Sequence, residues 1–377
     1  MLESRTRREL LAALGAGALL APLVSCATSS GRPHRYRRGY SRRPFVAPRI
    51  SMDDVIRVVV GHRPYRPAGF VVRSERLDAH VIVHNYGHGG GGLSLSWGSS
   101  ALAVREVSEL APGDAAVIGS GVMGLTSARL LQDAGWKVTI YTRDVARHTT
   151  SNVAAGEWSP FSVYDPQVAD SDFVARLEWA ARVAHHAFTN LGGRDYGVSW
   201  IEQYELSERP PQPSAAGPLA DLFPYRADLA PGEHPFGPLH ARRNVTMRIE
   251  PATFLRRLEQ DFRLAGGRFV IRSFVDVDEV LSLAERVVFN CTGLGAAALF
   301  GDDELTPAKG QLVFLPPDAD VDYFTLGGGR GLLYMFSRSD VLLLGGTFRP
   351  GDATTAADPA ETERIVSEHR RIFSRFG

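Results

Sequence analysis

The segment AAVIGSGVMGLTSARLLQDAGWKVTIYTRD, residues 115–144, joins a strand, a glycine-rich turn and a helix in the order that dinucleotide binding requires. Gly119 allows the tight turn out of the strand, Gly121 lets the backbone approach a pyrophosphate, and Gly124 lets the helix pack closely on the sheet. The phosphates would lie at the helix N-terminus, where backbone N–H groups and the helix dipole favour anions. The cofactor contacts expected from this turn are Gly119, Ser120, Gly121, Val122, Met123 and Gly124.

A second strand, Lys137 to Tyr141, follows at the expected distance. At the end of such a strand a carboxylate normally binds the ribose hydroxyls of the adenosine. Here that position is Arg143 and the next residue is Asp144, so Asp144 is the candidate ligand. Arg143 could instead hold a 2′-phosphate, which leaves NADP as the alternative cofactor.

Strands and helices alternate over much of the chain, which predicts an α/β fold with a doubly wound, Rossmann-type sheet and helices at 122–134 and 252–265. A second α+β domain is predicted from strands separated by turn residues, which is typical of an antiparallel sheet. The strands expected for the first sheet are His80–His84, Ala115–Ile118, Val138–Tyr141, Phe269–Ile271 and Val287–Asn290. Those expected for the second are Gly310–Leu315, Leu332–Ser337 and Val341–Gly346.

The 377 residues carry equal numbers of basic and acidic side chains, but the charge is unevenly distributed. Residues 1–50 hold ten arginines and two glutamates, so the rest of the chain holds 32 basic against 40 acidic residues. A negative body disfavours nucleic acid as a partner. No feature of the sequence specifies an oligomeric state.

The N-terminus resembles a bacterial twin-arginine lipoprotein signal over residues 1–26. Arg7 and Arg8 precede a short apolar segment, and Leu23-Val24-Ser25-Cys26 ends it, so Cys26 would carry the lipid. Residues 27–44 are rich in arginine and lack periodicity, which predicts a flexible tether. We therefore expect an exported protein, held by lipid on the extracytoplasmic side of the membrane; an uncleaved N-terminal anchor is the alternative.

Upstream of the glycine turn, residues 84–90 read His-Asn-Tyr-Gly-His-Gly-Gly, and Trp97-Gly98 follows. This block closely resembles the motif near the C-terminus of the D-amino-acid oxidase family. Three further segments resemble that family in its own order: the FAD turn at 119–124, the flavin segment Thr149-Thr150-Ser151-Asn152-Val153-Ala154-Ala155-Gly156, and Asn290-Cys291-Thr292-Gly293.

The family's last block thus stands first here, which resembles a circular permutation, and domain termini tolerate this because they lie at the surface. The C-terminal helix should then end close to Phe45–Ile50. The expected organisation is a signal (1–26), a tether (27–44), a permuted segment (45–110), an FAD-binding unit (111–159), part of the substrate domain (160–245), a return to the FAD domain (246–304), and the substrate sheet with the C-terminal helix (305–377).

The resemblance implies an FAD-dependent oxidase that transfers a hydride from the Cα of a D-amino acid to flavin N5, after which O2 is reduced to peroxide. Arg63 matches the arginine that binds the substrate carboxylate, for which a planar guanidinium is suited. Tyr334 matches a tyrosine on the same carboxylate, and the carbonyl of Gly90 would accept from the substrate amine. The further FAD contacts implied are Thr149, Thr150, Ser151, Ala155, Gly156, Phe274, Thr292, Gly89, Gly90, Gly91, Gly92, Leu93 and Ser94.

The chain departs from the family at several positions. Arg330 stands where a second tyrosine on a lid is expected, Gly91 replaces a common tyrosine, and Glu157 replaces an apolar residue beside the flavin. A carboxylate there could act as a base, stay neutral, or point away. No metal site is expected, because the glycines forbid the helix that His84 and His88 would need.

Three other functions remain open from the sequence. A D-aspartate or D-glutamate oxidase would use Arg330 or Arg349 to bind the second carboxylate. A dehydrogenase of the same fold would pass electrons to a membrane acceptor. A cofactor-free binding protein of the envelope is the non-enzymatic alternative.

Overall fold

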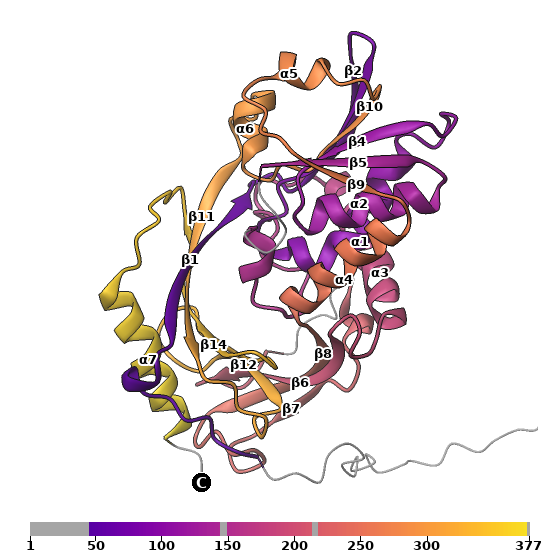
Figure 1. Cartoon of the computed structure of the whole chain (residues 1–377). Coiled ribbons are helices and arrows are strands. Elements are labelled where there is room, and N and C mark those ends of the chain that lie inside the picture. The colour runs from indigo at the N-terminus through magenta and orange to yellow at the C-terminus, as the bar shows by residue number, and fades with distance from the viewer. Residues whose placement is uncertain (1–44, 144–148, 213–217, 375–377) are drawn as a thin grey trace, which may run out of the picture. The chain divides into compact units, whose positions relative to one another are not determined.

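The computed structural model describes residues 45–143, 149–212 and 218–374, which contain two sheets (Figure 1). The predicted signal and tether, and Asp144, lie outside the described residues. Within the described ranges, no helix combines the length and the apolar composition needed to cross a bilayer.

The first sheet has six strands in the order β2-β3-β10-β4-β5-β9, and all neighbours are parallel except the β2–β3 hairpin. Each strand of this sheet expected from the sequence is present. The strands are β2 (Val71–Leu77), β3 (His80–Tyr86), β4 (Asp114–Ile118), β5 (Lys137–Thr142), β9 (Arg268–Ile271) and β10 (Val287–Asn290).

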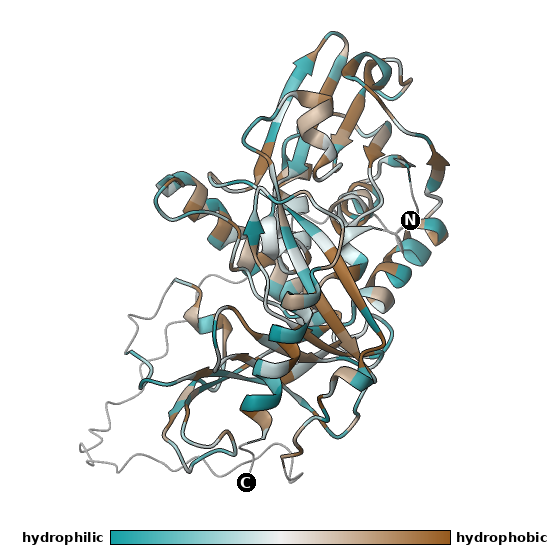
Figure 2. Ribbon diagram, turned by 90° about the vertical axis from the view of Figure 1, so that its left-hand side faces the viewer, coloured by the Kyte–Doolittle hydropathy of each residue, from teal (hydrophilic) through white to brown (hydrophobic). Residues whose placement is uncertain are grey.

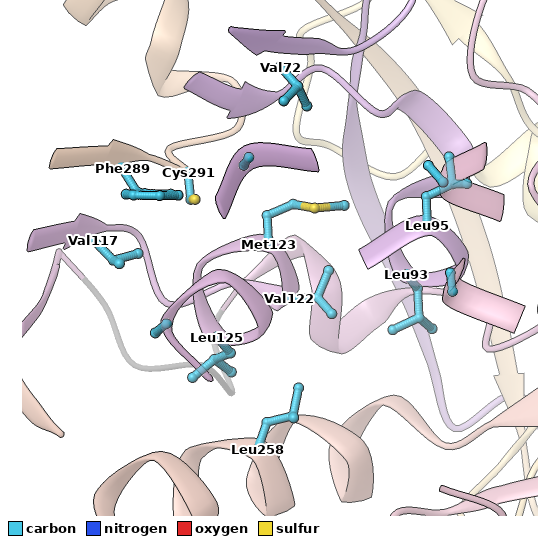
Figure 3. Close-up of a cluster of buried hydrophobic side chains, with 14 of the residues drawn as sticks. Val72, Leu93, Leu95, Val117, Val122, Met123, Leu125, Leu258, Phe289 and Cys291 are labelled. Carbon is cyan, nitrogen blue, oxygen red and sulfur yellow. The ribbon is translucent and has the colours of Figure 1, made fainter. Parts of the chain in front are cut away.

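Helices cover both faces of this sheet, which confirms the doubly wound prediction (Figure 1). One face is covered by α1 (Gly92–Arg105), α2 (Val122–Asp133) and α4 (Pro251–Leu264), and the other by α5 (Val277–Leu281) and α6 (Gly295–Phe300). Figure 3 shows the packing behind the glycine turn, where Val117 and Phe289 of neighbouring strands lie over α2 and Leu258 of α4 lies beyond it. This apolar core fixes the turn at one edge of the sheet.

The second sheet has nine strands, with β1-β11-β14-β13-β12-β6-β8-β7 along its path and β15 paired to β11. It is antiparallel as predicted except for one parallel pair, β6 with β12. Its strands are β1 (Arg57–Tyr65), β6 (Val198–Ser207), β7 (Ala227–Leu229), β8 (His240–Ile249), β11 (Thr306–Leu315), β12 (Tyr323–Gly327), β13 (Tyr334–Ser337), β14 (Leu342–Gly345) and β15 (Arg349–Pro350).

A helix covers one face of the second sheet. The C-terminal helix α7 (Pro359–Phe373) packs on one face, in an apolar cluster that also includes Phe45 and Ile50. The end of α7 and the start of the described chain therefore share one core. In Figure 2 several strands are hydrophobic along most of their length whereas the helices carry hydrophilic faces, as expected for sheets covered on both sides.

The helix α3 (Ser171–Asn190) was not predicted. Its N-cap is Asp170, whose carboxylate accepts from the backbone N–H of Phe173 at 2.7 Å. It packs against α1, where a Cβ on Gly98 would lie 1.8 Å from the carbonyl oxygen of Ala180. Gly98 is thus required for the close approach of the two helices.

Candidate functional site

A cavity of about 1190 Å³ lies between the two sheets. Its wall includes the residues that follow the carboxyl ends of β3, β4, β5, β9 and β10, where ligands of open α/β sheets bind. The second sheet supplies the opposite wall through side chains of β1, β11, β12 and β13.

The glycine turn has the close contacts that the sequence predicts. A Cβ on Gly124 would lie 1.9 Å from the carbonyl oxygen of Gly119, and Gly119 itself has φ +111°, a conformation suited to glycine. Gly121 faces the cavity, and the nearest atom to a Cβ there would be Ser151 Oγ at 3.3 Å. The turn therefore leaves backbone surface open for a pyrophosphate, and the residues present fit FAD.

Most of the predicted cofactor contacts line this cavity. They are Gly119, Ser120, Gly121, Val122, Met123, Arg143, Thr149, Thr150, Ser151, Ala155, Gly156, Phe274, Thr292, Gly89, Gly90, Gly92 and Leu93. Gly124, Gly91 and Ser94 lie behind the wall.

Each of these three residues has a packing role instead. Gly124 lets α2 approach Gly119, and a Cβ on Gly91 would lie 2.5 Å from the side chain of Val163. Ser94 Oγ donates to the carbonyl of Glu157 at 3.1 Å and accepts from the N–H of Ser159 at 2.8 Å. Ser94 thus joins α1 to the segment that follows Gly156.

Arg143 and Arg272 both line the end of the cavity where an adenosine would lie. Arg272 stacks over the ring of Phe274, with 4.6 Å from its Cζ to the ring centroid. The sequence did not indicate Arg272, because its place depends on the pairing of β9 with β5. The predicted ribose ligand Asp144 lies outside the described residues.

At the opposite end, Arg63 on β1 and Tyr334 on β13 come together. One guanidinium nitrogen of Arg63 donates to the Tyr334 hydroxyl at 3.2 Å, and the other donates to the carbonyl of Thr347 at 3.2 Å. Both side chains line the cavity. Arg63 and Tyr334 therefore form one polar site that can bind a carboxylate.

Two glycines make room for this pair. A Cβ on Gly310 would lie 2.5 Å from an Arg63 guanidinium nitrogen, and a Cβ on Gly345 would lie 1.9 Å from the Tyr334 ring. The arginine side chain crosses β11 over Gly310, and the tyrosine ring lies over Gly345 on β14. The position of the polar site thus depends on having glycine, with no Cβ, at both 310 and 345.

Residues of α7 support Arg63 from behind. The hydroxyl of Thr347 donates to Glu361 at 2.6 Å, and Glu361 pairs with Arg364 at 2.8 Å. Arg364 in turn donates to the carbonyl of Gly346 at 2.9 Å. The sequence did not indicate these residues, since only the folded structure places α7 behind the end of β14.

Glu157 lines the cavity, although most of its side chain is enclosed by protein. Burial, reinforced by the charge of Glu205, raises the pKa of Glu157 to about 8. Gln203 on β6 donates a hydrogen bond to Glu157 Oε1, which opposes the increase. Of the three possibilities considered from the sequence, the raised pKa favours the one in which the carboxyl group stays neutral.

The shifted pKa of Glu157 predicts a pH-dependent loss of stability. Because the folded-state pKa lies above the ordinary 4.5, this group stabilises the fold fully only below about pH 4.5 and loses that contribution as the pH rises through 8. Allowing for its contact with the cavity, we expect Glu157→Gln to be more stable than the unsubstituted protein at pH 9 by on the order of 2 kcal/mol, with little difference at pH 5. Thermal unfolding at both pH values measures this, and parallel pH profiles would contradict it.

The other charged residues considered from the sequence lie away from the cavity wall. Arg330 is largely exposed and lies 3.7 Å from Glu368, and Arg349 pairs with Asp358 and Glu361. Arg66 has a structural role, since it binds Asp302 and Glu304 at 3.0 Å each.

Burial raises the pKa of the Cys291 thiol to about 12, so this residue packs rather than reacts.

His84 and His88 have separate partners in the described chain. His84 lies on β3 and bonds Glu75 at 2.8 Å, whereas His88 bonds Ser99 at 2.6 Å. Burial lowers the pKa of His88 to about 3, so this ring is neutral at physiological pH. The His88 ring stacks on Phe70, whereas the His84 ring packs against Phe300 of α6.

Apolar side chains line the cavity where it meets solvent. Phe161 is 58% exposed, Leu332 49% and Phe348 37%, yet all three contribute to the cavity wall. Phe348 also lies beside the Arg63 guanidinium, 5.7 Å from its Cζ to the ring centroid. The entrance to the polar site is therefore hydrophobic.

Comparison with protein families gives a match to the DAO model, described as "FAD dependent oxidoreductase", over residues 114–377. Among curated proteins, the D-amino-acid oxidase of Rubrobacter xylanophilus is 31% identical over 257 residues, which is 67% of this chain and 74% of that protein. The D-amino-acid oxidase of Streptomyces coelicolor is 31% identical over 69% of this chain and 78% of its own. The D-aspartate oxidase of Homo sapiens is 26% identical, over 67% of this chain and 73% of that protein.

Among solved structures, the glycine oxidase from Geobacillus kaustophilus matches with a TM-score of 0.52 and 18% identity. The match covers 70% of this chain and 78% of that one. The L-proline dehydrogenase from P. horikoshii also has a TM-score of 0.52, at 14% identity, over 70% and 77% of the two chains. These likenesses confirm the predicted fold.

Proposed function

The chain belongs to the DAO family of FAD-dependent oxidoreductases, and from this premise we propose that it oxidises D-amino acids to imino acids, which hydrolyse to 2-oxo acids and ammonia. The observation that carries the proposal is the Arg63–Tyr334 pair at one end of a cavity whose other end has the glycine turn. Curated relatives that are D-amino-acid oxidases support the choice of the D enantiomer.

The described residues divide the work of binding and orientation. The Arg63 guanidinium pairs with the substrate carboxylate, the Tyr334 hydroxyl donates to it, and the Gly90 carbonyl accepts from the amine. Bound FAD supplies the acceptor for the α-hydride, and O2 then takes the electron pair to give H2O2. The apolar residues at the entrance, Phe161, Leu332 and Phe348, exclude water from the reacting centre.

Two alternatives from the sequence differ in their support. A D-aspartate or D-glutamate oxidase would need a second cation in the substrate pocket, but neither Arg330 nor Arg349 lines the cavity. A dehydrogenase that delivers electrons to a membrane acceptor would use the same Arg63–Tyr334 site. Its support is the predicted lipid anchor.

We further propose that the chain is a circular permutant with the organisation expected from its sequence. The family model begins only at residue 114, and residues 45–113 fall outside its match. Strand β1 from this block nevertheless pairs along its length with β11. The shared apolar cluster of Phe45, Ile50 and Phe373 supports adjacent original ends.

We also propose that the protein is exported and held on the extracytoplasmic face of the membrane by lipid on Cys26. The support is the sequence of residues 1–26 alone. Cell fractionation tests it: the unsubstituted protein should sediment with membranes and Cys26→Ser should not, whereas equal sedimentation of both would contradict the anchor.

Purified residues 27–377 test the catalytic proposal. We expect a yellow protein that releases peroxide with D-amino acids and not with their L-enantiomers. Bleaching by D-amino acids under anaerobic conditions without peroxide release in air would indicate the dehydrogenase. A colourless protein, or one that no amino acid reduces, would contradict the proposed function.

A further inference from the structure

We propose that Glu157 and Glu205 select substrates whose side chain ends in a positive charge, such as D-lysine and D-arginine. This inference rests on the proposed oxidation of D-amino acids and specifies the class of side chain. It follows from three observations: the position of Glu157 in the cavity wall, a second glutamate two residues beyond Gln203 on β6, and the distribution of arginines.

The backbone on either side of Glu157 is fixed. The carbonyl of Gly156 accepts from the N–H of Ile249 at 2.6 Å, and the N–H of Trp158 donates to Met247 at 2.8 Å. These bonds attach the segment to β8, with Glu157 opposite Arg248. The backbone around Glu157, a residue of the cavity wall, is therefore held in place, and Gln203 holds its carboxyl group.

This carboxyl group is incompletely satisfied. Gln203 donates to Oε1, and within the described residues Oε2 has no hydrogen-bond donor. Burial favours the protonated form of Glu157, and a cation that binds the open oxygen favours the ionised form, because the attraction offsets the cost of desolvation. A substrate ammonium or guanidinium supplies both the charge and the missing donor.

Glu205 does not line the cavity and is exposed, but its charge acts on Glu157. It lies two residues beyond Gln203 on β6, opposite Leu326, which is opposite Tyr334. Two strand spacings place its Cα about 10 Å from that of Tyr334, a distance comparable with the length of an extended lysine. Asn244 donates to Glu205 at 2.9 Å and leaves its charge intact.

The neighbouring cations do not neutralise this region. Arg242 also faces Glu205, but it binds both oxygens of Asp228, at 2.7 and 3.1 Å. Arg63 is engaged with the α-carboxylate site, and Arg143 and Arg272 lie at the adenosine end. A second carboxylate on the substrate would therefore be repelled by Glu157 and, more weakly, by the exposed Glu205, whereas a cation would be attracted by both.

Pairs of substrates that differ in one charge test the inference on the full chain purified with FAD. D-lysine is compared with D-norleucine, and D-arginine with D-citrulline. We expect kcat/KM to favour the cationic member of each pair by about tenfold or more, which corresponds to one charge-assisted contact. In Glu157→Gln this ratio should fall about tenfold, and in the exposed Glu205→Gln about threefold.

The matched control is Glu259→Gln on the surface of α4, where Glu259 pairs only with Arg263 in the described chain. This variant should keep the ratio of the unsubstituted protein. If the unsubstituted protein does not prefer the cationic substrates, or if Glu157→Gln keeps the preference, the inference is wrong.

A binding measurement separates this inference from the proposed reaction. 6-Aminohexanoate and hexanoate carry a carboxylate but no α-amine, so neither can be oxidised as a substrate. Calorimetry should give a lower Kd for 6-aminohexanoate, by about tenfold, and a smaller difference in Glu157→Gln. If no D-amino acid is turned over, the proposed function fails while this comparison still decides the role of Glu157; equal binding, or no binding of either acid, overturns the inference.

Discussion

Substitution of Arg63 by leucine is expected to lower kcat/KM for D-amino acids by about 10²- to 10⁴-fold. The change removes two charge-assisted hydrogen bonds to the substrate carboxylate, each worth about 1.5 to 3 kcal/mol. It also leaves that carboxylate beside the Phe348 ring without a counter-charge. Arg63→Lys should have an intermediate effect, because an ammonium cannot make the two parallel bonds of a guanidinium.

Steady-state kinetics on the flavin-containing variants measures this effect. The matched control is Arg57→Leu on the same strand, since Arg57 packs over Phe314 and does not line the cavity. This control should change kcat/KM less than threefold, and both variants should retain flavin absorbance. An Arg63→Leu variant with nearly unchanged kcat/KM would show that Arg63 does not bind the substrate carboxylate.

The partners of Arg63 show where prediction from this sequence stops. Arg63 and Tyr334 were identified by resemblance, each within a short motif. The need for Gly345 follows from its pairing with Tyr334, and the need for Gly310 follows from the pairing of β1 with β11, along which the Arg63 side chain reaches over Gly310. The register between β1 and β11, which lie almost 250 residues apart, depends on the whole fold, so the sequence alone could not provide it.

Local patterns predicted the first sheet well because each βα unit is fixed by neighbouring residues. The glycine turn between β4 and α2 is one example, since the strand, the turn and the helix are contiguous. The helix α3 was missed although its signals are present: an Asp170 N-cap, then buried residues that recur every three or four positions. Assigning 160–245 to a substrate domain built on an antiparallel sheet obscured this helical period.

Contacts between segments that lie far apart in the sequence could not be predicted from local patterns. The parallel pairing of β6 with β12 joins segments more than 100 residues apart, and nothing in either strand specifies its partner. The same holds for α7 behind Thr347, and for Gln203 beside Glu157. At position 157 the sequence indicated a departure from the family, and only the structure showed what surrounds the carboxyl group.

Substitution of Gly124 by valine is expected to abolish stable FAD binding, with an affinity loss of about 10²- to 10⁴-fold. A Cβ at this position would lie 1.9 Å from the carbonyl oxygen of Gly119, so α2 must move away from the turn. That shift misplaces the N–H groups at the helix N-terminus, and each hydrogen bond lost to the charged pyrophosphate costs about 1.5 to 3 kcal/mol.

The flavin absorbance of the purified variant, and its recovery on titration with FAD, measure the loss. Circular dichroism of the same sample distinguishes a displaced helix from an unfolded chain. The matched control is Gly113→Val just before β4, where a new Cβ would meet no atom within 4 Å, so this variant should remain yellow. If Gly124→Val instead retained full flavin content, α2 could be displaced from Gly119 without cost, and FAD binding would not depend on the contact between the helix and the turn.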